Sequence, residues 1–464
     1  MSILIAAGWS TWGLFVLLLL VFAFVSLVEN ERTAFLRSLS AGAASLIGLG
    51  GIFWLGPDIG RLILALLALA VAAPAVGFLI SPRPRRRLAI TGKPARIDER
   101  DTIFSRFSLQ DGSERKSEYY TRRPDLREID DRIRAKPQID HPDFFREHPV
   151  LRGLAQAQDA NLKRQLELVD GPVSGERTGG SPERNSRIIK EVVRYLGAPL
   201  CGIAELDRSF MYSHTGRGPE SYGSIIDSTH RYAVVFAVEM KMDMVATAPG
   251  PAVYTETETR YSDAARISIA AAGFLRRLGW PSRAHVSGSN YQAMLPPLAW
   301  RAGLGEMGRM GILITPRYGP RVRLGMVTTE MPLTIDSPIA FGVQDFCRRC
   351  QKCADNCPSG AIPSGDPEED NGVVRWVIRR EACYSFWGKA GSDCSRCLFV
   401  CPYSKPDNLL HNTIRRAAAR SIGAQRLFIK ADDWFYGRRP RARKQKNISA
   451  LTLEERVEAD RIHP

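Results

Sequence analysis

Three uninterrupted apolar segments open the chain. Ile3–Val28, Ser38–Gly56 and Leu62–Ser81 contain no charged side chain. A membrane-spanning helix needs about 20 apolar residues, so each segment is long enough, the second only just. A signal peptide fits less well, because no basic region precedes the first segment and no small-residue cleavage site follows it. No twin-arginine signal stands near the start. The pattern therefore predicts a transmembrane anchor of three helices over residues 1–82.

The basic residues beside these segments predict how the anchor is oriented. Arg32 and Arg37 lie in the first loop, residues 57–61 of the second loop have no net charge, and the run RPRRR, Arg83–Arg87, follows the third segment. Loops rich in Lys and Arg stay in the cytoplasm. We therefore expect an inner-membrane, multi-pass protein with the N-terminus outside and everything after Pro82 facing the cytoplasm.

Helical and strand patterns alternate after the anchor. Residues 83–190 are polar with short helical stretches such as DLREIDDRIRA, which predicts an arm that wraps the next domain. Arg231–Met240 has the continuous apolar pattern of a buried strand, and Arg321–Leu333 reads as another. RIIKEVVRYLGA and Ser262–Trp280 have apolar residues at helical spacing, the latter with Ser262 as a cap. The alternation predicts an α/β domain over residues 191–338.

Composition adds an expectation about partners. The 464 residues are 44% hydrophobic, which supports a folded core, and carry a formal net charge of +15. Such a charge suggests nucleic acid, a phospholipid surface or a small anion as partner. The stretch GRRPRARKQK, Gly437–Lys446, falls in a predicted basic C-terminal tail over residues 411–464. It suits anionic lipid heads or nucleic acid, and a solvated charged surface is the simpler alternative.

Eight of the nine cysteines lie within 55 residues, and the ninth, Cys201, stands apart. CRRCQKCADNCP has the bacterial ferredoxin spacing C-x2-C-x2-C-x3-C-P, whose fourth cysteine binds the other of two [4Fe–4S] clusters. The second half repeats C-x2-C-x3-C-P, with its first cysteine displaced. The spacing predicts a ferredoxin-like domain over residues 339–410. The expected ligands are Cys347, Cys350, Cys353 and Cys401 for cluster 1, and Cys357, Cys383, Cys394 and Cys397 for cluster 2.

Three other interpretations of these motifs fit less well. Four disulfides would need an oxidising compartment, and the tight spacing suits a compact metal cage instead. Two zinc sites are the simpler metal alternative, but zinc does not call for the x3-C-P ending on both halves. Gly303–Gly311 matches G-x-G-x-x-G, yet PPLAWRA before it looks helical, and no acidic residue follows at the distance of a nicotinamide site.

The stretches around the cysteines are specific. GLGEMGRMGILITPRYGPRVRLGMVTTEMPL precedes the first set, CYSFWGKAGSDCSRCLFVCPYSKP holds the second, and DDWFYGRRPRARK follows. From about Tyr212 to Arg443 the chain resembles the corrinoid- and iron–sulfur-dependent reductive dehalogenases. The resemblance implies a nitroreductase-like cobalamin-binding domain joined to the ferredoxin-like domain. Usual members carry a twin-arginine signal and a separate three-helix anchor protein, so this chain resembles an anchor fused to the catalytic subunit.

The resemblance also implies the site residues. Tyr261 matches the family's proton-donating tyrosine, which opens a helix, Asn290 matches its asparagine, and Arg323 its arginine; Tyr212 is expected to touch the corrinoid. Replacing carbon–halogen by carbon–hydrogen takes two electrons and one proton, so a proton donor is required. A nearby arginine stabilises the phenolate and offers a positive pole to the leaving halide. An asparagine can orient tyrosine or substrate by hydrogen bonds.

The resemblance therefore implies a reductive dehalogenase that acts on a halogenated organic substrate, with cob(I)alamin fed by the two clusters. One alternative is epoxyqueuosine reductase, another cobalamin enzyme with two such clusters, which the basic tail would suit. The other is a membrane electron-transfer iron–sulfur protein without corrinoid. We expect membrane lipid rather than nucleic acid as a partner. The electron donor, a quinone or a reduced ferredoxin or flavodoxin, stays open.

Overall fold

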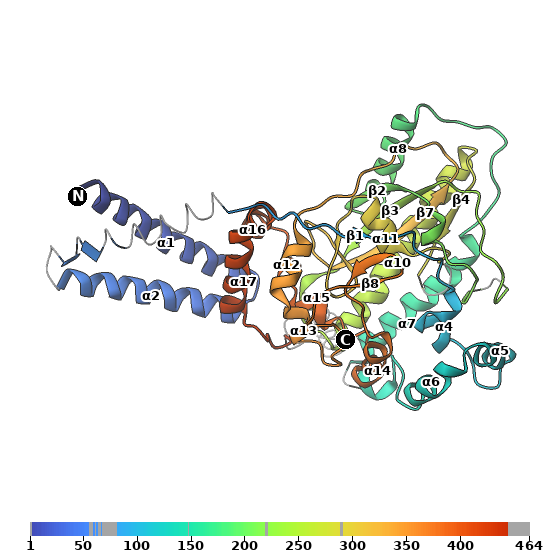
Figure 1. Cartoon of the computed structure of the whole chain (residues 1–464), viewed down its shortest axis with the longest axis horizontal. Coiled ribbons are helices and arrows are strands. Elements are labelled where there is room, and N and C mark those ends of the chain that lie inside the picture. Colours follow the sequence, from blue (N-terminus) through green and yellow to red (C-terminus); the bar gives the residue numbers. More distant parts are fainter. Residues whose placement is uncertain are drawn as a thin grey trace, which may run out of the picture. The chain divides into compact units, whose positions relative to one another are not determined.

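The computed structural model describes residues 2–54, 59–60, 62–63, 66, 81–146, 148–218, 221–287 and 291–443. The chain divides into two compact units (Figure 1). Unit 1 combines Met1–Arg85 with Pro406–Pro440, and unit 2 holds Arg86–Lys405 together with the segment after Pro440. The two ends of the chain thus contribute to unit 1.

Unit 1 consists, in its described part, of two N-terminal and two C-terminal helices. They are α1 (Ser2–Val28), α2 (Arg32–Trp54), α16 (Leu409–Arg420) and α17 (Ile422–Tyr436). The short turn around Asn30, whose φ is 57°, joins α1 to α2, and Trp12 Nε1 donates a hydrogen bond to Ser45 Oγ at 2.9 Å between them. α1 and α2 therefore form a helical hairpin.

Only one predicted membrane segment meets the length and hydropathy of a membrane-crossing helix within the described residues. Trp9–Val28 of α1 does so, with a mean hydropathy of 2.6. The second segment is helical in α2, but this helix starts with Arg32, includes Arg37 and is rich in Gly, Ala and Ser. The third segment lies almost wholly outside the described residues. Within the described residues, one apolar helix is therefore the evidence for the predicted membrane anchor.

The first part of the predicted basic tail over residues 411–464 is helical, because it contains most of α16 and all of α17. Asn408 and Ser421 accept hydrogen bonds from backbone amides in the first turns of α16 and α17, as N-cap residues do. The Phe435 ring lies 4.2 Å from the Phe22 ring of α1. Packing against a helix hundreds of residues earlier in the chain orders this segment, which its local sequence does not reveal.

Unit 2 is built around a four-stranded antiparallel sheet in the order β2-β3-β7-β4. Its strands are β2 (Leu200–Glu205), β3 (Tyr232–Glu239), β7 (Val322–Thr329) and β4 (Ser282–His285). β3 confirms the strand predicted at Arg231–Met240, and β7 the one predicted at Arg321–Leu333. In register, Val238 lies opposite Arg323 and Glu239 opposite Val322.

Side chains of β3 alternate between two cores, one on each face of the sheet. Val234, Phe236 and Val238 enter the core formed with α8 (Pro182–Tyr195) and α10 (Pro251–Arg277). Ala233, Val235 and Ala237 enter the core formed with α11 (Leu295–Arg301). A strand buried on both faces reads as a continuous apolar run because successive side chains point to opposite faces.

α10 differs from its prediction. It begins at Pro251 rather than at Ser262, so Ser262 is not a cap and Tyr261 lies inside the helix instead of opening it. The missed first turns contain Thr255, Glu256 and Thr257, which are polar yet buried. Polar residues at buried positions hide the hydrophobic period on which a helix prediction rests.

The predicted arm, catalytic domain and ferredoxin-like domain fall within the single compact unit 2. β1 (Ala89–Ile90) of the arm pairs with β9 (Val373–Arg375), which also pairs with β8 (Glu368–Asp370). The arm also contains the helices α4 (Ile103–Phe107), α5 (Glu114–Arg122), α6 (Arg127–Arg134) and α7 (Pro149–Arg164). One strand of the arm thus pairs with a strand of the predicted ferredoxin-like domain.

The glycine-rich stretch at residues 303–311 does not lead from a strand into a helix. It carries β5 (Glu306–Met307), which pairs with β6 (Leu313–Ile314) in a hairpin. Glycine is required at position 305, because a Cβ there would lie 2.2 Å from the Ile314 carbonyl oxygen. This geometry does not match the strand–turn–helix of a nicotinamide site.

Candidate functional site

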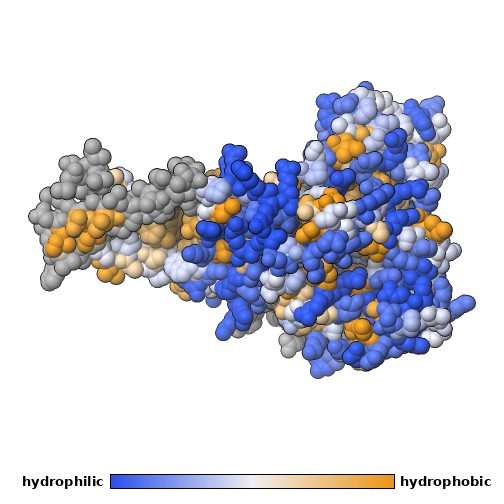
Figure 2. Space-filling view, viewed as in Figure 1, coloured by the Kyte–Doolittle hydropathy of each residue, from blue (hydrophilic) through white to orange (hydrophobic). Residues whose placement is uncertain are grey.

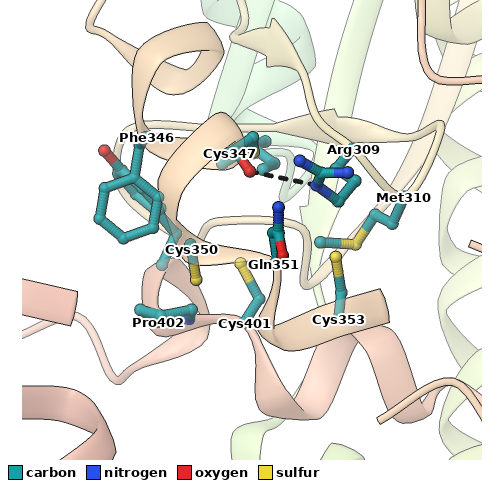
Figure 3. A pocket seen from close by; sticks show the side chains of 11 residues that line it. Arg309, Met310, Phe346, Cys347, Cys350, Gln351, Cys353, Cys401 and Pro402 are labelled. Atoms are coloured by element: carbon teal, nitrogen blue, oxygen red, sulfur yellow. Dashed lines mark hydrogen bonds between the residues drawn. The ribbon is translucent and has the colours of Figure 1, made fainter. Parts of the chain in front are cut away.

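The four cysteines expected to hold cluster 1 line one cavity (Figure 3). Cys347 and Cys350 belong to α12 (Val343–Cys350), Cys353 to α13 (Lys352–Asp355), and Cys401 follows α15 (Arg396–Val400). Gln351 takes a left-handed φ of 54° and so ends one helix and starts the next. The sulfurs of Cys350, Cys353 and Cys401 turn toward one another.

The second set of cysteines is also gathered in space. Cys383 lies on α14 (Arg380–Ala390), where burial and the nearby Cys357 raise its pKa to about 11. Burial raises the pKa of Cys394 to about 12, with Cys383 and Cys357 among its neighbours. Burial and the thiolates of Cys394, Cys353, Cys383 and Cys357 also raise the pKa of Cys397. The expected ligands of cluster 2 thus lie close enough to influence one another's ionisation.

This arrangement suits iron–sulfur cubes better than single ions. Buried thiolates that repel one another need nearby cations to stay deprotonated. Among the residues that the structure describes, no three His, Cys, Asp or Glu are placed to hold one metal ion. A zinc ion needs its ligands around a single point, whereas a cube accepts one thiolate at each iron corner.

Arg309 holds the backbone at Cys347, an expected ligand of cluster 1, and no sequence pattern predicted this role. Its side chain is buried, and Nε donates to the Cys347 carbonyl at 3.1 Å (Figure 3). Nη1 donates to the carbonyls of Pro363 and Gly365, each at 2.7 Å. The guanidinium lies 4.7 Å from the centre of the Trp376 ring. Arg309 therefore fixes the backbone of one expected ligand.

The structure brings Tyr261 and Arg323 together. Tyr261 comes from α10 and Arg323 from the neighbouring strand β7, and the guanidinium carbon lies 5.1 Å from the centre of the tyrosine ring. Burial opposes the charge on Arg323, but Tyr261 and Asp393 outweigh it and leave its pKa raised. Arg323 is therefore a permanent positive charge beside the phenol. Asn290 lies outside the described residues, so its place in this site is not observed.

Asp393 links Arg323, and through it Tyr261, to the loop that carries Cys394, which we call the loop of cluster 2. Arg323 Nη2 donates to Asp393 Oδ2 and to Thr257 Oγ1, each at 2.8 Å. Thr257 and Ser395 also donate to Asp393 Oδ2, at 2.8 and 3.0 Å. Asp393 directly precedes Cys394, an expected ligand of cluster 2. The network thus runs from the tyrosine ring to the cluster loop.

Two polar atoms of this network have no hydrogen-bond partner among the described residues. They are Arg323 Nε and Asp393 Oδ1, and both are buried. Buried polar atoms in proteins are nearly always satisfied by protein, water or ligand. The described residues of the site therefore leave one donor and one acceptor without a protein partner.

Tyr291 lies near Tyr261, and Tyr212 lies near Tyr291. Burial raises the pKa of Tyr291, and Tyr261 and Tyr212 are among the groups close enough to contribute. Burial also raises the pKa of Tyr212 to about 12. Both rings pack against the core that α11 forms with the sheet. The sequence offered one signal for Tyr291, its position next to the predicted Asn290.

Glu258 is the unusual acid of the site. It stands one helical turn before Tyr261 on α10, and burial, with Asp159 and Asp393 nearby, raises its pKa to about 7. A carboxyl group with such a pKa can hold or release a proton near neutral pH. Its surroundings became visible only in the folded protein, because Asp159 comes from α7 and Asp393 from the cluster loop.

Comparisons with known proteins agree with the two parts of this site. Residues 346–405 match the family model of the 4Fe-4S dicluster domain. Tetrachloroethene reductive dehalogenase of Desulfitobacterium hafniense is 33% identical over 302 residues, which is 55% of this chain and 54% of the relative. The enzyme of the same name from Sulfurospirillum multivorans is 30% identical over 286 residues, 54% and 56% of the two chains. The chain thus spans about half the length of these relatives.

Solved structures give the same picture for the fold. A catabolic reductive dehalogenase superposes with a TM-score of 0.63 at 26% identity, over 78% of this chain and 49% of that chain. The same enzyme in complex with 3-bromo-4-hydroxybenzoic acid gives a TM-score of 0.62. Epoxyqueuosine reductase of Bacillus anthracis is 33% identical over 110 residues, which is 23% of this chain and 28% of that protein.

Proposed function

We propose that this chain is a reductive dehalogenase, which replaces the carbon–halogen bond of an organic halide by carbon–hydrogen. The observation that carries the proposal is the network from Tyr261 through Arg323 and Asp393 to the loop of Cys394. It joins a proton donor and a fixed positive charge to an electron relay. Reductive removal of a halide needs these three elements together.

The two sets of cysteines hold the electron relay. Cys347, Cys350, Cys353 and Cys401 bind one [4Fe–4S] cluster, and Cys357, Cys383, Cys394 and Cys397 bind the other. The crossing of Cys357 and Cys401 between the sets keeps the clusters adjacent, as in two-cluster ferredoxins. When bound, the two clusters would relay single electrons toward the catalytic site.

The residues around Tyr261 fit a corrinoid. Beside Tyr261, Arg323 Nε and Asp393 Oδ1 offer a donor and an acceptor without partners in the described chain. When bound, the corrinoid supplies the strongly reducing centre that breaks the carbon–halogen bond. Tyr261, Arg323 and Tyr212 would be among the residues that hold it.

Tyr261 delivers the proton to the organic fragment. The positive charge of Arg323, 5.1 Å from the ring, stabilises the phenolate that remains. It also attracts the departing halide. Asn290 orients either the tyrosine or the substrate by hydrogen bonds, and Glu258 stands one turn away as a group that can return a proton to Tyr261.

The anchor places this chemistry at a membrane. We propose that residues 1–82 cross the inner membrane three times and leave unit 2 in the cytoplasm. The apolar helix α1 and the cations that follow the apolar segments support this topology. A reporter domain fused after Pro464 that is active only in the periplasm would overturn it. The electron donor is then either a membrane quinone or a reduced cytoplasmic carrier.

A halide-release assay tests the proposal. Purified anaerobically with its cofactors, the chain should release bromide or chloride from halogenated phenols when given a low-potential electron donor. An absorption spectrum without corrinoid bands would refute both cobalamin interpretations and favour an electron-transfer protein. Bound corrinoid with no halide release across a broad organohalide panel would favour the epoxyqueuosine reductase alternative, which shares a 110-residue similarity.

A further inference from the structure

The outer faces of α16 and α17 carry an unusual distribution of charge. Among the described residues of unit 1, every exposed charged side chain is Arg or Lys, namely Arg32, Arg83, Arg85, Arg416, Arg420, Arg426, Lys430 and Arg439. The acids are covered or paired; Glu29 contacts His411 Nε2 at 3.0 Å, and Asp433 pairs with Arg438 at 3.1 Å. The exposed charge on the described part of this unit is therefore wholly positive.

Four of these cations form pairs at helical spacing. Arg416 and Arg420 stand four residues apart on α16, and Arg426 and Lys430 do so on α17. Like charges at this spacing lie on one face of a helix and repel each other. We call these four residues the basic face. Figure 2 shows hydrophilic side chains gathered over α16 and α17.

Apolar side chains stand within the same surface. Leu427 is 55% exposed and Trp434 is 48% exposed on α17, next to the cations of that helix. An exposed tryptophan and leucine beside Lys and Arg are typical of helices that lie in the interface of a membrane. Tryptophan prefers the level of the lipid headgroups.

The neighbouring helices place this surface at one end of the apolar hairpin. Glu29, in the turn between α1 and α2, binds Asn408 and His411 of the C-terminal segment. Arg37 of α2 donates to the Trp434 carbonyl. Phe24, Leu27 and Val28 of α1, close to that turn, expose their side chains. When α1 crosses a membrane, α16 and α17 therefore lie at the level of the lipid headgroups.

We propose that α16 and α17 dock on the surface of an anionic phospholipid bilayer. The basic face binds the lipid phosphates, and Leu427 and Trp434 enter the boundary between headgroups and acyl chains. An anionic surface relieves the repulsion within each pair of cations, so charge complementarity selects it over a zwitterionic one. The proposal rests on membrane insertion of α1 and is independent of the dehalogenase chemistry.

Lipid crosslinking in nanodiscs tests this proposal. The full-length protein is reconstituted with phosphatidylglycerol whose headgroup carries a photoactivatable probe, and the crosslinked peptides are identified by mass spectrometry. We expect adducts within residues 409–436. Each cation near an anionic surface strengthens binding about fivefold, so the variant Arg416→Gln, Arg420→Gln, Arg426→Gln and Lys430→Gln should lose most of these adducts while still entering the nanodiscs.

A matched control replaces four exposed arginines of unit 2 by Gln, namely Arg164, Arg184, Arg187 and Arg194, and should keep the adducts. Equal labelling by phosphatidylcholine carrying the same probe would overturn the proposal. So would adducts in the basic-face variant as abundant as in the wild type. Co-purified RNA that shields residues 409–436 from lipid would assign the basic face to nucleic acid instead.

Discussion

Replacing Asp393 by Ala removes the carboxylate on which the catalytic network converges. Asp393 Oδ2 accepts hydrogen bonds from Arg323, Thr257 and Ser395, and the ion pair with Arg323 spans 2.8 Å. Only 14% of the Arg323 side chain and 10% of the Asp393 side chain are exposed. The substitution therefore leaves a buried positive charge without its counter-ion.

The expected loss in the free energy of unfolding follows from the burial of this ion pair. Removing one partner of a buried ion pair destabilises a protein by about 3–5 kcal/mol. Unit 2 contains about 320 residues between Arg86 and Lys405. At an unfolding entropy of about 2 cal/mol/K per residue, the midpoint of thermal unfolding should fall by roughly 4–8 °C. Asp393→Asn should cost less, because the amide oxygen still accepts from Thr257 and Ser395.

Anaerobic thermal unfolding at one fixed scan rate measures this effect, after iron content has shown that both clusters are present. The exposed pair Arg208–Asp227 is the control, and Asp227→Ala should change the free energy of unfolding by less than about 1 kcal/mol. In an Arg323→Met background, Asp393→Ala should cost far less, because no buried charge is stranded. An equal cost in both backgrounds would refute the coupling of Arg323 and Asp393.

Three further substitutions test the site. Tyr261→Phe should keep the ring beside Arg323 and lower kcat of halide release by about 10²–10⁴ with little change in KM, because the proton donor is lost. Cys401→Ser should lower the iron content by about half and abolish electron delivery, measured by iron analysis and EPR of the reduced protein. Glu258→Gln should alter the pH dependence of stability. Burial raises the pKa of Glu258 from 4.5 to about 7. The protonated Glu258 carboxyl therefore stabilises the folded state fully below about pH 4.5, and this stabilisation is lost as the pH rises to 7. Thermal unfolding at several pH values should show that the wild type loses about 1.4 kcal/mol per pH unit in this window relative to the variant.

Each of these substitutions has a matched control. Tyr195→Phe changes an exposed tyrosine of α8 and should leave kcat unchanged. Cys201→Ser changes the cysteine outside both sets and should keep the full iron content. Glu128→Gln, on the exposed face of α6, should not alter the pH dependence. Full activity of Tyr261→Phe would remove Tyr261 from the mechanism, and a stability profile of Glu258→Gln that matches the wild type would contradict the pKa argument.

Local patterns predicted the parts of the protein that depend on local physics. The cysteine spacing predicted the two-cluster domain that residues 346–405 match, and the continuous apolar run predicted β3. The start of α10 was missed because Thr255, Glu256 and Thr257 are buried by tertiary contacts despite their polarity. Asp393 and Arg309 were missed for a related reason, since their partners lie far away in the sequence.

Because Met1–Arg85 and Pro406–Pro440 both belong to unit 1, the stretch Arg86–Lys405 of unit 2 is in effect an insertion between them. Ribosomes release α1 and α2 before this stretch and α16 and α17 after it, so unit 1 is completed only after Arg86–Lys405 has been synthesised. A single proteolytic cut within unit 2 would leave both fragments attached to unit 1. Non-denaturing electrophoresis of a nicked sample should therefore show one species, and denaturing electrophoresis should show two.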